Sequence, residues 1–412
     1  MIKFEAIKNK LNDYKAEYLL RFYDELDVAE QSNLLSTIEE VDFEELNKIN
    51  ERIVESTNFT DVSPFEDVIE ADKMNSDEKE IYHKIAEETI RTGKLAICIM
   101  AGGQGSRLGH IGPKGTFMVE LGNGITKSIF ELCISNILKA KEKYGVYPYC
   151  FIMTSTLNHV ETVDFFEKNN YFGYDKSKIM FFMQGKMPLT DLDGNIVLEN
   201  KSSVYLAPNG NGGIFKALDD NKVLSLMEDK GIEYLYITNV DNILTNPYEE
   251  TILGSLVSSH TQLGVKTLLK KEANEKVGVC CQRDGKFLIV EYIDLPKEFA
   301  EKTLEDGSLA FKDSYFGTCY LSLELLKKIA REKLPYHKAK KKNEYIDKNG
   351  VLIKAEEVNS IKYEMFIFDG FFKADSVKLY RVKREEEFAP IKGKEDIEEA
   401  VKLYNNKMWL KG

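Results

Sequence analysis

The sequence predicts an α/β protein built on a mixed, mostly parallel central sheet with helices on both faces. The fold class rests on the alternation of apolar runs typical of buried strands with helical segments between residues 95 and 271, and the 43% hydrophobic content of the 412-residue chain indicates a globular protein. Strands that alternate with helices favour a largely parallel sheet covered on both sides. The length is sufficient for two or three domains.

The first part of the chain has helical periodicity. In residues 1–90, apolar residues recur three and four positions apart, for example in "LNDYKAEYLLRFYDEL" and "SNLLSTIEEVDFEELNKI". We expect Asn75 or Ser76 to cap a helix over residues 74–90. Gly93 ends that pattern, and the apolar run "LAICIMA" (95–101) predicts the first buried strand.

The remaining elements follow in alternation. Helices are expected at 128–145 and 213–231, strands at 149–155, 178–184, 234–241 and 264–271, strand-like pieces at 365–372 and 376–382, and a final helix near 395–410. This order predicts three parts: a helical N-terminal domain (1–92), an α/β catalytic domain (93–340) and a small C-terminal α+β domain (341–412).

Composition excludes several classes of protein. The net charge of −12 argues against nonspecific nucleic-acid binding. No apolar run approaches the ~20 residues that span a bilayer, and the N-terminus lacks the apolar core of a signal peptide. The cysteines form no C-x-x-C pair, which favours free thiols in a reducing compartment and a cytoplasmic location. They are Cys98, Cys133, Cys150, Cys280, Cys281 and Cys319.

A glycine-rich loop follows the first predicted strand. "IMAGGQGSRLGHIGPKG" (99–115) contains six glycines, Arg107 and Lys114. The spacing matches neither the dinucleotide fingerprint nor the P-loop. Glycines let backbone N–H groups approach an anion, and Arg107 and Lys114 add charge. The stretch therefore predicts a phosphate-binding loop of a third kind; the alternative is a tight turn with two solvated basic residues.

Two further strand ends carry polar residues. "LAPNGNGGIFKAL" (206–218) is a second glycine-rich turn, suited to a flat base or a sugar, or simply a turn before a helix. Asp241 ends the strand "YLYITNVD", where one carboxylate beside phosphates suits Mg²⁺; capping of the next turn is the alternative. "TDLDGN" (190–195) has the D-x-D form of a metal site, but we interpret it as a hairpin turn.

In the C-terminal third, polar residues stand where apolar ones would be expected. Lys362 and Glu364 precede a strand-like run, and Lys392 follows Pro390. The five histidines show no ligand spacing and no arrangement of nucleophile and base.

Together these motifs resemble the UDP-N-acetylglucosamine pyrophosphorylases, within the eukaryotic-type UTP–sugar-1-phosphate uridylyltransferases. The resemblance runs in order from about residue 95 to 393 and rests on eight stretches. They are "MAGGQGSRLGHIGPKG", "FFMQGKMP", "APNGNGGIFKAL", "NVDNIL", "GVCCQRDGKFLIVEY", "LPYHKAKKKNEYID", "NSIKYEMFIFD" and "REEEFAPIK".

The resemblance implies a Rossmann-like core of the nucleotide-diphospho-sugar transferase type and a reaction of UTP with a sugar 1-phosphate, assisted by Mg²⁺. It implies that Arg107, Lys114 and Lys392 are catalytic and that Asp241 lies beside the metal and the phosphates. Nucleotide-binding positions are implied at Met100, Ala101, Gly102, Gly103, Lys114, Gln184, Gly210, Asp241 and Lys362, and sugar-binding positions at Asn211, Gly278, Glu291, Tyr292, Thr318 and Lys392. It leaves the oligomeric state open, and a monomer is the simplest expectation.

Two positions depart from the family pattern. Thr318 stands where asparagine usually lines the N-acetyl side of the sugar, and Gly393 stands where asparagine usually follows "PIK". The first departure keeps glucose and galactose open as alternatives to N-acetylglucosamine. A glycosyltransferase or a non-catalytic nucleotide-sugar sensor is a more distant alternative.

Overall fold

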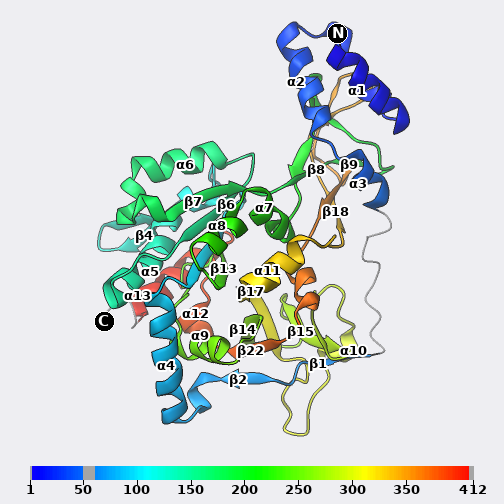
Figure 1. The fold of residues 1–412 in the computed structure, drawn as a ribbon. Coiled ribbons are helices and arrows are strands. Elements are labelled where there is room, and N and C mark those ends of the chain that lie inside the picture. Colours follow the sequence, from blue (N-terminus) through cyan, green and yellow to red (C-terminus); the bar gives the residue numbers. More distant parts are fainter. Residues whose placement is uncertain (1, 50–60, 408–412) are drawn as a thin grey trace. The chain divides into compact units, whose positions relative to one another are not determined.

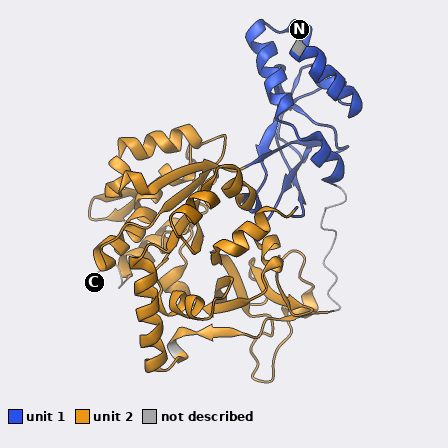
Figure 2. Ribbon diagram, viewed as in Figure 1, with its two compact units in different colours: residues 1–55, 185–213, 333–367 blue, residues 56–184, 214–332, 368–412 orange. Residues whose placement is uncertain are grey.

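The computed structural model describes residues 2–49 and 61–407 (Figure 1). Contacts divide the chain into two compact units, each made of three separate segments (Figure 2). Unit 1 contains residues 1–55, 185–213 and 333–367, and unit 2 contains residues 56–184, 214–332 and 368–412. These units do not coincide with the three consecutive parts expected from the sequence. The reason is that residues 1–55 and 333–367 pack with residues 185–213, from the middle of the chain, in unit 1.

Unit 1 combines N-terminal helices with short strands drawn from its later segments. Its core joins Leu11, Leu34 and Ile38 of the helices to Leu198 and Ile346 of the strands, all buried. Its elements are α1 (Ile2–Asp13), α2 (Val28–Glu39), α3 (Phe43–Lys48), β8 (Lys186–Pro188), β9 (Thr190–Asp191), β10 (Leu198–Asn200), β11 (Ser203–Val204), β12 (Leu206–Pro208), β18 (His337–Lys341), β19 (Tyr345–Ile346), β20 (Leu352–Ile353) and β21 (Ser360–Glu364).

Unit 2 contains an 11-stranded mixed sheet with the main order β2-β22-β14-β17-β13-β3-β6-β7. The strands of this sheet are β1 (Val62–Pro64), β2 (Val68–Glu70), β3 (Leu95–Met100), β6 (Cys150–Thr154), β7 (Ile179–Met183), β13 (Tyr234–Asn239), β14 (Leu263–Leu269), β15 (Gly278–Arg283), β16 (Lys286–Val290), β17 (Asp313–Ser322) and β22 (Val377–Arg381), while β4 (Met118–Gly122) and β5 (Ile125–Ser128) pair only with each other. Strands β13, β3, β6 and β7 are parallel neighbours, whereas β17 runs antiparallel to β13 and β14. The α/β prediction with a mixed central sheet is confirmed.

Helices cover this sheet. The helices α4, α5 and α9 share one core with β3, in which Leu95, Ile97 and Ile99 are fully or almost fully buried. The helices α7, α8 and α11 pack together as a second group. The helices of unit 2 are α4 (Ser76–Arg91), α5 (Ile129–Tyr144), α6 (His159–Lys168), α7 (Ile214–Asp220), α8 (Val223–Asp229), α9 (Glu250–Ser258), α10 (Lys297–Ala300), α11 (Leu323–Ala330), α12 (Arg384–Glu387) and α13 (Ile397–Asn406). Among the described residues, no helix has the length and apolar character needed to cross a membrane.

Several local predictions can be compared with these elements. Asn75 caps α4 by accepting the N–H of Glu78, as expected. The hairpin interpretation of residues 190–195 is also confirmed, because Asp191 accepts the N–H groups of Asp193 and Asn195 at 3.0 and 2.8 Å. The prediction of a strand at 365–372 is wrong, because residues 367–373 form a 3₁₀ helix.

Two strands were missed in the region read as helical. The strands β1 and β2 lie between helices of the N-terminal part, and they pair with β15 and β22. Each has only three residues, so neither is long enough to show the alternation that identifies a strand.

All six cysteines are buried and free. Burial, with a smaller contribution from Asp241, raises the pKa of Cys133 to about 12. Its thiol donates to the carbonyl oxygen of Val240 at 3.4 Å. A buried, protonated thiol is a poor nucleophile, so Cys133 is a packing residue although it lies near Asp241.

Candidate active site

The glycine loop is held by its carbonyl groups. The loop leaves β3 at Ala101, and the side chain of Asn158 donates to the carbonyl oxygens of Ala101 and Gly103 at 2.9 and 3.3 Å. Ser155 Oγ donates to the carbonyl oxygen of Gly102 at 2.9 Å. Within the described residues, the N–H groups of Gly102 and Gly103 donate to no protein acceptor. The loop therefore keeps two adjacent backbone donors available for an anion.

The rest of the loop forms a short hairpin. Gly105 N–H donates to the carbonyl oxygen of Gly112 at 3.0 Å, and Lys114 N–H donates to that of Gly103 at 3.1 Å. At the tip, Gly109 has a φ of 69°, a conformation that strongly favours glycine. Arg107 precedes it and is exposed, with no carboxylate partner among the residues that the structure describes.

Lys114 and Asp241 meet at the carboxyl ends of two neighbouring strands. The strands β3 and β13 are parallel, and Met100 pairs with Asn239 at their ends. Lys114 Nζ lies 3.3 Å from Asp241 Oδ2, and the two side chains are only 16% and 19% exposed. Ligands in open α/β sheets bind at this edge, so the predicted proximity of these two residues is observed.

Asp241 is the only acidic candidate for a metal ligand that the sequence singled out here. Within residues 2–49 and 61–407, no group of three His, Cys, Asp or Glu side chains could hold a metal ion. One partly exposed carboxylate fits Mg²⁺, which takes one or two carboxylates and completes its shell with substrate phosphates and water. It does not fit a metal that needs an all-protein cage.

Asn242 ties a C-terminal segment to this strand end, a role that its sequence context did not reveal. Its side chain donates to the carbonyl oxygen of Glu387 at 2.8 Å and accepts the N–H of Ala389 at 3.0 Å. Ile391 N–H donates to the carbonyl oxygen of Asp241 at 2.9 Å. Lys392 comes next in the chain, so these bonds fix its backbone beside Asp241.

A buried ion pair anchors the same segment. Lys266 Nζ lies 3.0 Å from Glu387 Oε1, and the two side chains are 0% and 6% exposed. Lys266 also donates to the carbonyl oxygen of Asn246 at 2.8 Å. Burial raises the pKa of Glu387, although Lys266 and Lys407 oppose the shift. Burial lowers the pKa of Lys407 well below its ordinary value. Three buried ionisable side chains, those of Lys266, Glu387 and Lys407, therefore lie at or next to the segment that leads to Lys392.

Gln184 lies directly against the loop. A Cβ atom added to Gly102 would overlap the side-chain amide nitrogen of Gln184. Gln184 is held by its backbone N–H, which donates to the carbonyl oxygen of Thr154 at 2.9 Å. The missing side chain at Gly102 is therefore what allows the Gln184 amide to approach the phosphate-binding loop.

The residues matched to a sugar site form a hairpin. The strands β15 and β16 pair so that Gly278 faces Glu291, and a Cβ added to Gly278 would lie 3.6 Å from Glu291 Oε1. Tyr292 is 41% exposed, whereas Thr318 is 1% exposed. The Thr318 hydroxyl is buried and faces Tyr236, whose pKa it lowers against the effect of burial. Thr318 therefore lies behind the surface in this structure rather than on it.

Three predicted residues belong to unit 1. Gly210 has a φ of 88°, and Asn211 Oδ1 accepts the N–H of Ile367 at 3.0 Å. Lys362 Nζ donates to Glu364 Oε1 at 2.6 Å. The second glycine turn and β21 are thus joined within unit 1, whereas all the other predicted residues belong to unit 2.

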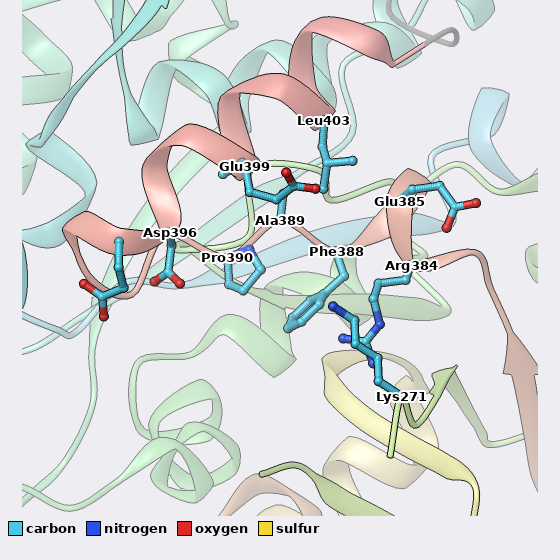
Figure 3. Close-up of a pocket in the computed structure, with 11 residues that line it drawn as sticks. Lys271, Arg384, Glu385, Phe388, Ala389, Pro390, Asp396, Glu399 and Leu403 are labelled. Atoms are coloured by element: carbon cyan, nitrogen blue, oxygen red, sulfur yellow. The ribbon is translucent and has the colours of Figure 1, made fainter. Parts of the chain in front are cut away.

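A pocket of about 320 Å³ borders the segment that carries Lys392 (Figure 3). Lys271 and Arg384 lie next to Phe388, and Asp396 lies at the other end (Figure 3). Its lining also includes Glu385, Glu395 and Glu399, and none of the residues predicted to bind phosphate. Four carboxylates disfavour a polyphosphate, so this pocket is distinct from the predicted site.

Comparisons with known proteins show what the chain is similar to. The family model for UTP–glucose-1-phosphate uridylyltransferase matches residues 42–407. The chain is 33% identical to UDP-N-acetylhexosamine pyrophosphorylase-like protein 1 of Xenopus tropicalis, over 94% of this chain and 80% of the relative. It is 34% identical to the UDP-N-acetylglucosamine pyrophosphorylase of Saccharomyces cerevisiae, over 77% and 68%. The crystal structure of the uridine diphosphate N-acetylglucosamine pyrophosphorylase of Trypanosoma brucei matches with a TM-score of 0.80 at 28% identity, covering 98% of this chain and 84% of that one.

Proposed function

Because this chain belongs to the UTP–glucose-1-phosphate uridylyltransferase family, we propose that it is a UDP-N-acetylglucosamine pyrophosphorylase. UTP and N-acetylglucosamine 1-phosphate give UDP-N-acetylglucosamine and pyrophosphate. The observation that carries the proposal is the meeting of Lys114, Asp241 and the free N–H groups of the glycine loop at one sheet edge. A glycosyltransferase that consumes a UDP-sugar would need no such grip on a triphosphate.

The chemistry requires positioning and charge rather than a general base. A phosphate oxygen of the sugar 1-phosphate, already an anion, attacks the α-phosphorus of UTP in line. A bond forms between this oxygen and the α-phosphorus. The bond between the α-phosphorus and the oxygen that bridges to the β-phosphate breaks, and pyrophosphate leaves with the electron pair. Arg107, Lys114 and Lys392 offset the repulsion between two polyanions and stabilise the charge that develops on the leaving group.

The remaining residues would recognise the two ends of the substrates. Gln184 and Gly210 read the uracil ring, while Lys362 contacts phosphate. Gly278, Glu291 and Tyr292 hold the sugar, and the proximity of Gly278 to Glu291 supports the pairing of these two residues. Asn211 is proposed as a further sugar contact on the resemblance alone. The burial of Thr318 supports an indirect influence on the sugar pocket, through the packing of β17, rather than direct contact.

Mg²⁺ would be held by Asp241 together with phosphate oxygens and water. When bound, it would neutralise charge on the phosphates. The free, buried cysteines support a reducing compartment, and we propose the cytoplasm.

The deciding experiment is pyrophosphate release from the purified protein with UTP and Mg²⁺. N-acetylglucosamine, N-acetylgalactosamine, glucose and galactose 1-phosphates are compared side by side. We expect the fastest turnover with N-acetylglucosamine 1-phosphate. A preference for glucose or galactose 1-phosphate would leave the mechanism unchanged but would show a different sugar specificity. Thr318 would then be the first residue to mutate. Absence of release with all four would contradict the catalytic proposal and favour a nucleotide-sugar sensor.

A single methyl group can test the role of Gln184. We expect Gly102→Ala to raise the KM for UTP about tenfold, because the added Cβ displaces the Gln184 amide from the loop and one base contact is worth ~1–1.5 kcal/mol. The KM for the sugar 1-phosphate should stay within twofold of the wild-type value. Steady-state kinetics with each substrate varied in turn measure both. An unchanged KM for UTP would mean that Gln184 does not read the nucleotide from this position.

A further inference from the structure

Lys394 is a cation that approaches the glycine loop from the C-terminal segment. A Cβ atom built on Gly109 would lie 3.1 Å from Lys394 Nζ and 3.3 Å from its Cε. The ammonium group therefore lies against the tip of the loop that contains Arg107. Lys394 is exposed, and no carboxylate lies within ion-pair distance of it among the described residues.

In the turn around Lys394, the acidic side chains and the lysine lie on different sides. Asp396 Oδ2 accepts the N–H groups of Lys392 and Gly393, both at 2.8 Å, which closes a tight turn. Glu395 and Asp396 line the neighbouring pocket, whereas Lys392 and Lys394 do not. The turn thus directs acidic side chains to the pocket and one lysine, Lys394, to the loop.

The position of this turn is fixed from behind. Ile391 N–H donates to the carbonyl oxygen of Asp241 at 2.9 Å, and Asn242 holds Glu387 and Ala389. Because the loop is also held, by Ser155 and Asn158, the contact between Lys394 and Gly109 joins two anchored segments. The backbone on both sides is therefore in place before a ligand binds, which reduces the entropy lost on binding.

The loop has two distinguishable ends. The Gln184 amide lies against Gly102 at the base of the hairpin, whereas Lys394 lies against Gly109 at its tip. A nucleotide whose base is read by Gln184 extends its phosphates away from that amide. We propose that Lys394 binds the β- and γ-phosphates of the nucleotide, which are the two phosphates of the pyrophosphate product. This inference rests on the proposed function and adds a phosphate-binding residue to it.

Binding and turnover experiments separate the two proposals. Calorimetric titration with magnesium pyrophosphate, without a second substrate, tests Lys394 whether or not the protein turns over. We expect Lys394→Ala to bind pyrophosphate about tenfold more weakly than the wild type, since a hydrogen bond to a charged group is stronger than one between neutral groups but this lysine is exposed. Lys394→Arg, which keeps the charge, should restore the affinity to within threefold. Equal affinities of the wild type and Lys394→Ala, or no binding by the wild type, would overturn the proposal.

Steady-state kinetics distinguish a contact with pyrophosphate from a general effect on the loop. In the reverse reaction, Lys394→Ala should raise the KM for pyrophosphate about tenfold and leave the KM for UDP-N-acetylglucosamine within twofold. A structural role in shaping the loop would raise both constants together and would contradict the assignment. Lys402→Ala is the matched control, because Lys402 is an exposed lysine on α13 with only a 3.7 Å ion pair to Glu399. Absence of turnover by the wild type would instead contradict the proposed function, while the calorimetric result for Lys394 would stand.

Discussion

Lys392→Ala should lower kcat by about 10²–10³-fold, the cost of removing one donor that stabilises transition-state charge. The backbone of Lys392 follows Ile391, whose N–H group is bonded to Asp241, so the lysine emerges at the predicted phosphate site. The KM for UTP should change much less than kcat, because the glycine loop, Arg107 and Lys114 remain. Single-turnover kinetics of pyrophosphate release measure the chemical step directly.

Two controls give that result its meaning. The melting temperature of Lys392→Ala should match the wild type, because the side chain is exposed. Lys394→Ala should differ in kind, with an effect on pyrophosphate affinity that exceeds its effect on kcat. A Lys392→Ala variant with near-normal kcat would remove this residue from the mechanism.

Lys266→Met should reduce the free energy of unfolding by about 3–5 kcal/mol, because it leaves the buried carboxylate of Glu387 without its closest cation. Burial already raises the pKa of Glu387 in the presence of Lys266. Lys407 also lowers the pKa of Glu387, but its effect is smaller than that of Lys266. Urea denaturation followed by circular dichroism measures the loss.

The double variant Lys266→Met/Glu387→Met tests the cause. Replacing a buried ion pair by apolar side chains of similar volume is often neutral or stabilising, so the double variant should recover most of the lost stability. If it is as unstable as Lys266→Met, the loss comes from packing and not from the unpaired charge. Its kcat would still fall if the ion pair also holds the segment before Lys392 in place.

The parts of the fold predicted well are those with a strong local signal. A continuous apolar run identified β3, and an N-cap with an amphipathic pattern identified α4. The glycine loop, Lys114 and Asp241 could be placed together because parallel strands end at one edge. The 3₁₀ helix at residues 367–373 was misjudged, since a buried apolar run has the same composition in a strand and in a short helix.

What sequence reasoning missed depends on contacts between distant segments. Asn242 acts through Glu387 and Ala389, nearly 150 positions away, and nothing local marks it. Nothing in the local sequence distinguishes Lys394 from other surface lysines, and only the fold places its ammonium group against Gly109. Unit 1 could not be predicted as one domain for the same reason, because its three segments are separated in the sequence by stretches of unit 2.

The segmented build of unit 1 has a consequence for synthesis on the ribosome. Its N-terminal helices are translated first, yet their core needs Leu198 and Ile346. At ~5–20 residues per second, residues 333–367 follow residue 55 by roughly 15 to 60 s. During that interval the apolar faces of α1 and α2 lack part of their native cover, which makes the nascent chain a natural client for chaperones. A C-terminal truncation that removes residues 333–367 would make that exposure permanent.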